Sequence, residues 1–219
     1  MSSAFFSSPL MPWLAALATV LILLVYELLQ WLAERQQPAT LARSAHANLR
    51  EEWFAAISAH PGSEILAIQT LRNSLMSATM TASTAALGLM GAATLAAPSL
   101  NASLAASSAF SEQFTARLAL ELTLMTLLFV SLVCSAMAVR YYNHVGFIVG
   151  MPAGAKASQQ WRATGAMYLR RAGLLYSWGL RHLLMVAPIL ASIVYPLAGP
   201  VAALLVVMAL YGFDRFTVR

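Results

Sequence analysis

Residues 172–213 read AGLLYSWGLRHLLMVAPILASIVYPLAGPVAALLVVMALYGF, and this nearly unbroken apolar stretch decides the fold class. A single helix of about 40 residues would be about 60 Å long, roughly twice the thickness of the hydrocarbon core of a bilayer. The stretch must therefore turn, and the two prolines and the glycine in residues 195–200 (YPLAGP) mark the place. We expect a hairpin of two helices, at about 173–195 and 200–213.

Three further apolar runs have the length of about 20 residues that a membrane-spanning helix needs. They cover residues 13–31, 75–97 and 118–139, and the first has a tryptophan at both ends, as favoured at membrane interfaces. Only 10% of the 219 residues are charged and 60% are hydrophobic, whereas a soluble domain carries about 25% charged residues. The sequence therefore predicts an all-α fold, a polytopic bundle of about five spans that forms one integral membrane domain over residues 1–219.

The basic residues indicate how the chain is oriented. All but Arg117 and Arg181 fall in residues 31–74, in residues 140–173 and in the C-terminal tail, while residues 98–112 and the turn at Pro196 carry none. Five spans place all three basic segments on one side, whereas four would separate the tail from the others. The positive-inside rule then predicts an external N-terminus and a cytoplasmic C-terminus. The expected location of the chain is a bacterial inner membrane. Residues 1–10 contain no Lys or Arg, so the first run is expected to be a retained helix rather than a cleaved signal.

Four segments between the spans also carry predictions. Residues 41–57 and 161–172 have apolar side chains at helical spacing, beside arginines. Each is expected to be an amphipathic helix, lying either in the headgroup plane or at the cytoplasmic end of the bundle. Residues 98–112 are expected to form a polar loop, and residues 146–154 a glycine-rich re-entrant segment or loop, because Pro152 interrupts a helix.

The second predicted span is unusually polar for a membrane helix. Arg72 and Asn73 stand at its cytoplasmic entrance, and Ser77, Thr81 and Thr84 follow within it. Small side chains allow close helix packing, and hydroxyls can form hydrogen bonds across helices, which gives one explanation. The other is a wet surface along a pore or substrate path, where hydroxyls replace water around a polar solute.

Charged and polar residues near the other spans give further candidates. Arg117 and Glu121 lie one helical turn apart and can form an ion pair, although Arg117 is expected rather to extend its side chain toward the lipid headgroups. Because charge within a membrane is costly, Arg181 in the fourth span is expected to pair with Glu27 near the end of the first. Asn143 and His144 stand where the third span meets the cytoplasm, and His144 is expected to be a hydrogen-bonded structural residue.

The sequence gives no reason to expect catalysis. It contains no Gly-x-Ser-x-Gly, His-Glu-x-x-His or Cys-x-x-Cys motif and no phosphate-binding glycine loop, so an enzyme is not expected. No two of the four histidines have metal-ligand spacing on one helix, so neither a metal nor another cofactor is predicted. The lone Cys134 is expected to be a packed thiol. The net charge is +5, and the basic residues lie beside apolar spans. This placement indicates anionic lipid headgroups as partners and not nucleic acid.

Several segments resemble one known family, that of domain of unknown function 599. They are Ile68–Met76 with the Ser/Thr-rich run after it, Tyr142-Asn143-His144, Gly179-Leu180-Arg181 before an apolar run, and Tyr211-Gly212-Phe213-Asp214. Together they cover most of the chain from about Glu27 onward. The resemblance implies a four- or five-helix integral membrane protein of bacteria and plants, without an assigned activity. It draws attention to Arg72, Asn73, Asn143, His144 and Arg181.

Two functional hypotheses of different classes follow. The first is an oligomeric membrane channel, a pore for ions or small solutes, with the polar second span along the path and a basic mouth that favours anions. The second is a non-conducting membrane scaffold or accessory subunit of a larger complex, in which the polar span is a helix-packing face. The expected protein partner is accordingly a second copy of the chain or another subunit of a membrane complex.

Overall fold

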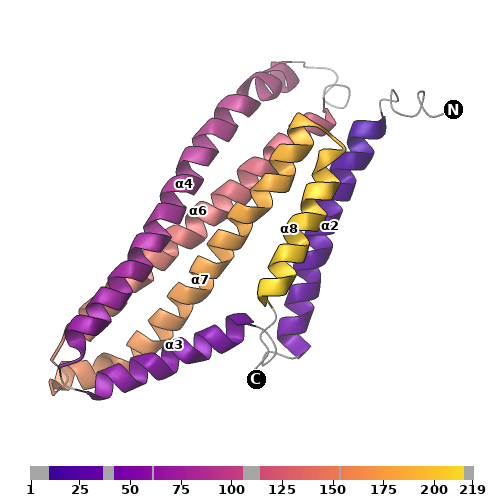
Figure 1. Ribbon diagram of the computed structural model, residues 1–219. Helices are drawn as coiled ribbons and strands as arrows, with labels where there is room; N and C mark the ends of the chain where they lie inside the picture. The colour runs from indigo at the N-terminus through magenta and orange to yellow at the C-terminus, as the bar shows by residue number, and fades with distance from the viewer. Residues whose placement is uncertain (1–9, 37–41, 61, 106–113, 153, 215–219) are drawn as a thin grey trace. The chain divides into compact units, whose positions relative to one another are not determined.

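The computed structural model describes residues 10–36, 42–60, 62–105, 114–152 and 154–214, and these form six helices (Figure 1). No strand occurs within these ranges, so the predicted all-α class is confirmed. The helices follow one another as α2 (Leu10–Gln36), α3 (Ala42–Ala59), α4 (Glu64–Ala105), α6 (Ala116–Val149), α7 (Lys156–Val194) and α8 (Ala198–Asp214).

Four of these helices, α2, α4, α6 and α7, are long and apolar enough to cross a membrane, and α8 is a shorter apolar helix. With 42 residues, α4 has a length of about 63 Å, so it extends well beyond a hydrocarbon core of about 30 Å. The predicted C-terminal hairpin is confirmed as a pair of helices. Its turn is closed by a 2.9 Å hydrogen bond from the Ala198 amide to the Tyr195 carbonyl oxygen.

The prediction of a polar loop at residues 98–112 is wrong for residues 98–105, because α4 continues through Pro98 to Ala105. Alanine, which is frequent here, has the highest helix propensity. The Ser103 hydroxyl donates a 2.8 Å hydrogen bond to the Ser99 carbonyl oxygen one turn back, so this serine is accommodated within a helix. A proline is also tolerated in membrane helices when its surroundings satisfy the freed backbone group. Residues 106–112 lie outside the described residues.

Two other expected interruptions are absent from the described helices. The segment 161–172 is not a separate helix, because it belongs to the continuous α7 together with the predicted fourth span. The glycine-rich segment is helical as far as Val149, and α6 ends three residues before Pro152. Proline disfavours helical geometry in the residue before it, which explains why α6 ends close to Pro152. It gives no reason for the helix to end earlier, and α6 continues through Gly146.

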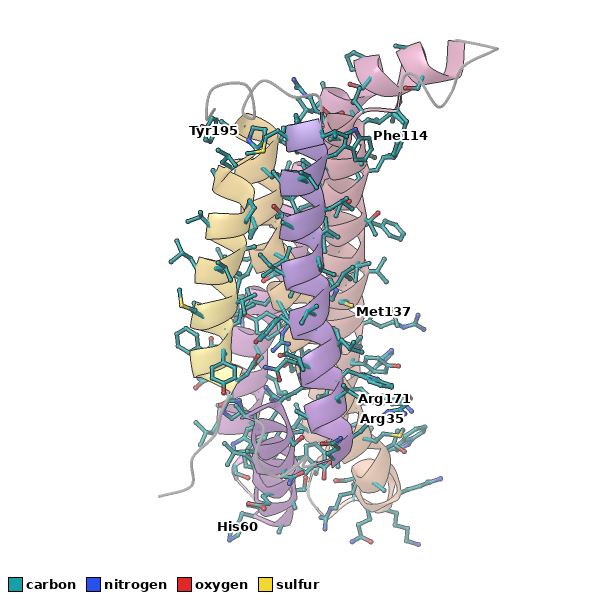
Figure 2. All side chains as sticks on the ribbon, turned by 90° about the vertical axis from the view of Figure 1, so that its right-hand side faces the viewer. Arg35, His60, Phe114, Met137, Arg171 and Tyr195 are labelled. Carbon is teal, nitrogen blue, oxygen red and sulfur yellow. The ribbon has the colours of Figure 1, made fainter. Side chains whose placement is uncertain are left out.

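The helices divide into two compact units. The first comprises Met1–Gln36, Ala85–Phe129 and His182–Phe213, and its apolar core includes Leu124, Leu128 and Ile189. Within it, α2, α7 and α8 approach closely at Gly199, where an added Cβ would lie 2.5 Å from the Thr19 hydroxyl oxygen. The outer face of α8 carries exposed apolar side chains (Figure 2), among them Val201, Leu204, Leu205 and Met208.

The second unit comprises Gln37–Thr84, Val130–Arg181 and Asp214–Arg219. In it α3 lies antiparallel along the first half of α7, since successive contacts run backward along one helix and forward along the other. From one end to the other these contacts pair Ser58 with Arg162, Phe54 with Gly165, Glu51 with Arg170, and Arg43 with Trp178. The expected helix at 41–57 is therefore confirmed as a helix, and it packs against its neighbour with Phe54 in the core.

Candidate functional site

The polar residues of α4 lie on two different sides of the helix. Its buried stripe consists mainly of small residues, including Ala78, Thr81 and Ala85. Asn73, Ser77 and Thr84 are exposed, and their spacing of four and seven residues returns them to one face of a helix. Met80 is exposed in the same row. The structure thus separates Thr81 from the other predicted residues and leaves a mainly polar row on the outside of the chain.

Arg72 stands beside this row near the beginning of α4. Its side chain and that of Asn73 are both exposed. Arg72 is one residue away from Asn73 and so lies at about 100° around the helix from it. The arginine therefore flanks the row, at the end nearest to the N-terminus of α4.

The hydroxyl groups of α4 are bonded within their own helix. Ser77 donates to the Asn73 carbonyl oxygen at 3.1 Å, and Thr84 donates to that of Met80 at 2.9 Å. Thr81 does the same toward Ser77 at 3.0 Å. Each hydroxyl thus has its hydrogen engaged, while its oxygen keeps the capacity to accept a hydrogen bond.

Small residues make a close contact between α6 and α7 in the second unit, whereas the sequence had directed attention to packing by the second predicted span. Ser131 donates a 2.7 Å hydrogen bond to the Gly179 carbonyl oxygen. A Cβ added at Gly179 would clash with the Ser135 hydroxyl oxygen. Small and hydroxylated residues bring membrane helices close together in this manner. The sequence signal was present, as a serine pair at i and i+4 in an apolar run, but its partner lies 48 residues away along the chain.

Asn143 and His144 lie exposed near the end of α6. The centroid of the Tyr168 ring lies 6.0 Å from that of the His144 ring and 5.3 Å from that of the Tyr141 ring. Tyr168 of α7 therefore contacts two rings that are one turn apart on α6. This arrangement gives His144 a packing role at the α6–α7 contact.

Arg181 is buried in α7, with 5% of its side chain exposed, and it forms an ion pair with Asp214 at the end of α8. The sequence pattern did not predict this partner. The expected pairing of Arg181 with Glu27 joins residues of different units and stays a prediction. The other expected pair is confirmed, because Arg117 Nε lies 2.9 Å from Glu121 Oε1. Glu121 is almost fully buried, and its second oxygen has no hydrogen-bond partner among the described residues.

Sequence reasoning missed a half-open cavity of about 260 Å³. It lies within the second unit, and α3, α4, α6 and α7 all contribute to its lining. Its polar residues are Arg50, Thr70, Ser74 and Tyr142. No sequence motif joins these four residues, which come from three helices, so only the packed structure reveals the cavity.

The described part of the chain contains no cluster of three His, Cys, Asp or Glu side chains that could hold a metal ion. Cys134, expected to be packed, is half-buried in α6. The chemistry on offer is that of hydroxyls, amides and arginines on long apolar helices. These groups can bind anions and polar solutes or join helices.

The long apolar helices define the class of the protein, a polytopic α-helical membrane protein. Comparison with family models then gives its family: residues 14–218 match the model described as "Protein of unknown function, DUF599". The chain therefore belongs to the DUF599 family, as its segments around Arg72, His144 and Arg181 predicted. No curated protein and no solved structure matches the chain.

Proposed function

We propose that several copies of the chain assemble into a membrane pore whose path follows the exposed row of α4. The observation that carries the proposal is the exposure of Asn73, Ser77 and Thr84 on a helix long and apolar enough to span a membrane. The candidate path is the row formed by these three residues and Met80, and Arg72 stands at its mouth.

The argument rests on what surrounds an exposed polar row in a bilayer. Lipid tails offer hydroxyls and amides no hydrogen bonds, so polar side chains in spans face a protein partner or a water-filled cavity. In this row the hydroxyl oxygens of Ser77 and Thr84 can still accept hydrogen bonds from the water that fills such a path. A ring of copies that turn this row inward satisfies both conditions.

The proposal includes five crossings of a bacterial inner membrane. With 17 residues, α8 reaches about 26 Å, slightly less than a hydrocarbon core of about 30 Å, so it can cross with modest thinning of the bilayer. Five crossings put the basic ends of α3, α4, α6 and α7 on the cytoplasmic side with the C-terminus. Arg72 then marks a cytoplasmic mouth, and its charge favours anions.

Purified protein in liposomes provides the test. We expect the passage of chloride or nitrate down a gradient, and we expect Arg72→Ala to reduce the preference for these anions over potassium. Arg171→Ala is the matched control because it removes one positive charge from an exposed site on α7 (Figure 2). Liposomes that pass none of the common ions would overturn the proposal.

The second candidate function is a non-conducting scaffold or accessory subunit. It is favoured by the hydrogen bonds that the α4 hydroxyls already make within their own helix, since such a face can pack against another helix without water. Two results together would support it. The liposomes would show no ion flux, and a membrane protein would co-purify in fixed stoichiometry and protect a cysteine introduced by Ser77→Cys from a thiol reagent. A flux that depends on Arg72 would exclude it.

A further inference from the structure

The cavity of the second unit has a polar side and an apolar side. Arg50 is the only charged residue among the described residues that line it. The apolar side is formed by side chains that include Leu49, Trp53 and Leu169. A cavity of about 260 Å³ is large enough for several non-hydrogen atoms, far more than one water molecule needs.

The Arg50 guanidinium is held at this cavity by close contact with α7. A Cβ added at Gly173 would overlap the guanidinium carbon and lie 2.7 Å from Nε, so only a glycine leaves room for this placement. In the described part of the chain, Arg50 forms no ion pair with a carboxylate, whereas Arg170 and Arg181 pair with Glu51 and Asp214. The cationic group therefore faces the cavity without a negative partner from the described chain.

Among the described residues that line the cavity, the donors available to an anion include the guanidinium of Arg50 and the phenol of Tyr142. Thr70 and Ser74 donate their hydroxyl hydrogens to carbonyl oxygens of their own helix, so these two side chains present only acceptor oxygens to the cavity. The phenol of Tyr142 is mostly buried and lines the same cavity as Arg50 and Ser74. No carboxylate belongs to the lining given by the described residues. A planar guanidinium with five N–H groups can bind an oxyanion through two parallel hydrogen bonds, and phosphate is a common partner.

We propose that this cavity binds a phosphate group, with Arg50 as the primary ligand and Tyr142 beside it. The leucines and Trp53 on the apolar side favour the phosphate of a membrane phospholipid, whose acyl chains they can contact, over free inorganic phosphate. Tryptophan is enriched at the level of the headgroups, where such a site belongs. This inference does not depend on conduction, because a pore and a scaffold can each bind a lipid here.

Native mass spectrometry of the delipidated protein in detergent tests the site. The probes are dioleoyl phosphatidylglycerol and dioleoyl phosphatidylcholine, which differ in the net charge of the headgroup. We expect tighter binding of phosphatidylglycerol, and about tenfold weaker binding of that lipid to Arg50→Gln, because one charge-assisted bidentate contact is lost. Arg171→Gln removes an exposed charge from the same unit as a control and should leave the affinity nearly unchanged.

Two further variants keep the test decisive if Arg50→Gln fails to fold. Arg50→Lys retains the charge but loses the bidentate geometry, and Gly173→Ala retains both charge and arginine but displaces the guanidinium. Both should weaken binding, with thermal unfolding confirming the fold. Competition with inorganic phosphate separates the two sources of the phosphate group. If inorganic phosphate displaces the lipid, and this displacement is lost in Arg50→Lys, the site belongs to the free anion. If inorganic phosphate does not displace the lipid, the site belongs to the lipid headgroup. Equal losses in Arg50→Gln and Arg171→Gln would overturn the proposal.

Discussion

Arg181, buried in the middle of α7, forms an ion pair with Asp214, the last residue of α8. The two residues are 33 positions apart, and the helical hairpin at Pro196 brings them together. A charge at this depth needs a partner because taking an ion out of water costs several kcal/mol. The pair thus connects the end of the hairpin to the helix on which it folds back.

Replacing Asp214 by alanine should destabilise the protein strongly. Removal of one partner from a buried ion pair costs about 3 kcal/mol, since the remaining charge loses its compensation. The matched control is Glu51→Ala, which breaks the exposed pair with Arg170 and should cost less than about 1 kcal/mol. Unfolding in a detergent titration, followed by tryptophan fluorescence, measures both. Equal losses in the two variants would contradict a structural role for the buried pair.

Gly179→Ala should weaken the contact between α6 and α7. The new Cβ clashes with the Ser135 hydroxyl oxygen and lies 3.2 Å from the Ser131 carbonyl oxygen, so we expect a loss of about 1 to 3 kcal/mol. Gly91→Ala is the control, because nothing lies within 4 Å of a Cβ there and alanine favours the helix. Thermal unfolding temperatures report the difference. If Gly179→Ala is as stable as Gly91→Ala, the close contact does not exist in the membrane.

The Arg117–Glu121 pair predicts an asymmetric response to mutation. Arg117 is 61% exposed, whereas Glu121 is buried with one oxygen unpartnered among the described residues. Arg117→Ala should therefore destabilise the protein by about 1 to 3 kcal/mol, because it leaves a buried carboxylate uncompensated. Glu121→Gln should cost less, because it removes the buried charge itself. Thermal unfolding of both variants decides the order, and a larger loss for Glu121→Gln would show that the carboxylate is stabilised by something other than Arg117.

The five-crossing topology predicts which residues a membrane-impermeant thiol reagent reaches in whole cells. On a background in which Cys134, the single cysteine, is replaced by serine, Asn101→Cys should react from outside. Arg219→Cys should react only after the cells are opened, because this topology places the basic segments in the cytoplasm. Labelling of both positions from the same side would exclude five crossings.

Hydrophobic length and prolines predicted most of the fold, because a bilayer requires long, internally hydrogen-bonded helices. Sequence reasoning failed where polar residues continue a helix, as at Ser99 and Ser103, whose neighbours were assigned to a loop. The hydroxyl of Ser103 bonds back to its own helix, so polarity does not end α4 there. The helix at 161–172 was also expected to be separate from the span that begins at 173, but α7 is continuous there, and Gly165 and Gly173 admit the side chains of α3.

The candidate site was predictable in its residues but not in its geometry. Residue spacing placed Ser77, Thr81 and Thr84 on one span, yet only packing shows that Thr81 is buried and the other two are exposed. The Arg50 cavity was beyond sequence reasoning, because its lining comes from four helices and depends on the missing side chain of Gly173. Tertiary partners of this kind are set by how helices pack and leave no local signature.

The most direct test of the pore compares thiol accessibility at two neighbouring positions of α4. Ser77→Cys and Met76→Cys lie at almost the same depth, but about 100° apart around the helix, and both positions are exposed in the single chain. In proteoliposomes of the Cys134→Ser protein, a water-soluble thiol reagent should modify Ser77→Cys much faster than Met76→Cys, and the modification should block anion flux. Equal and slow modification at both positions would show that lipid or protein, not water, covers the row, and would contradict the pore.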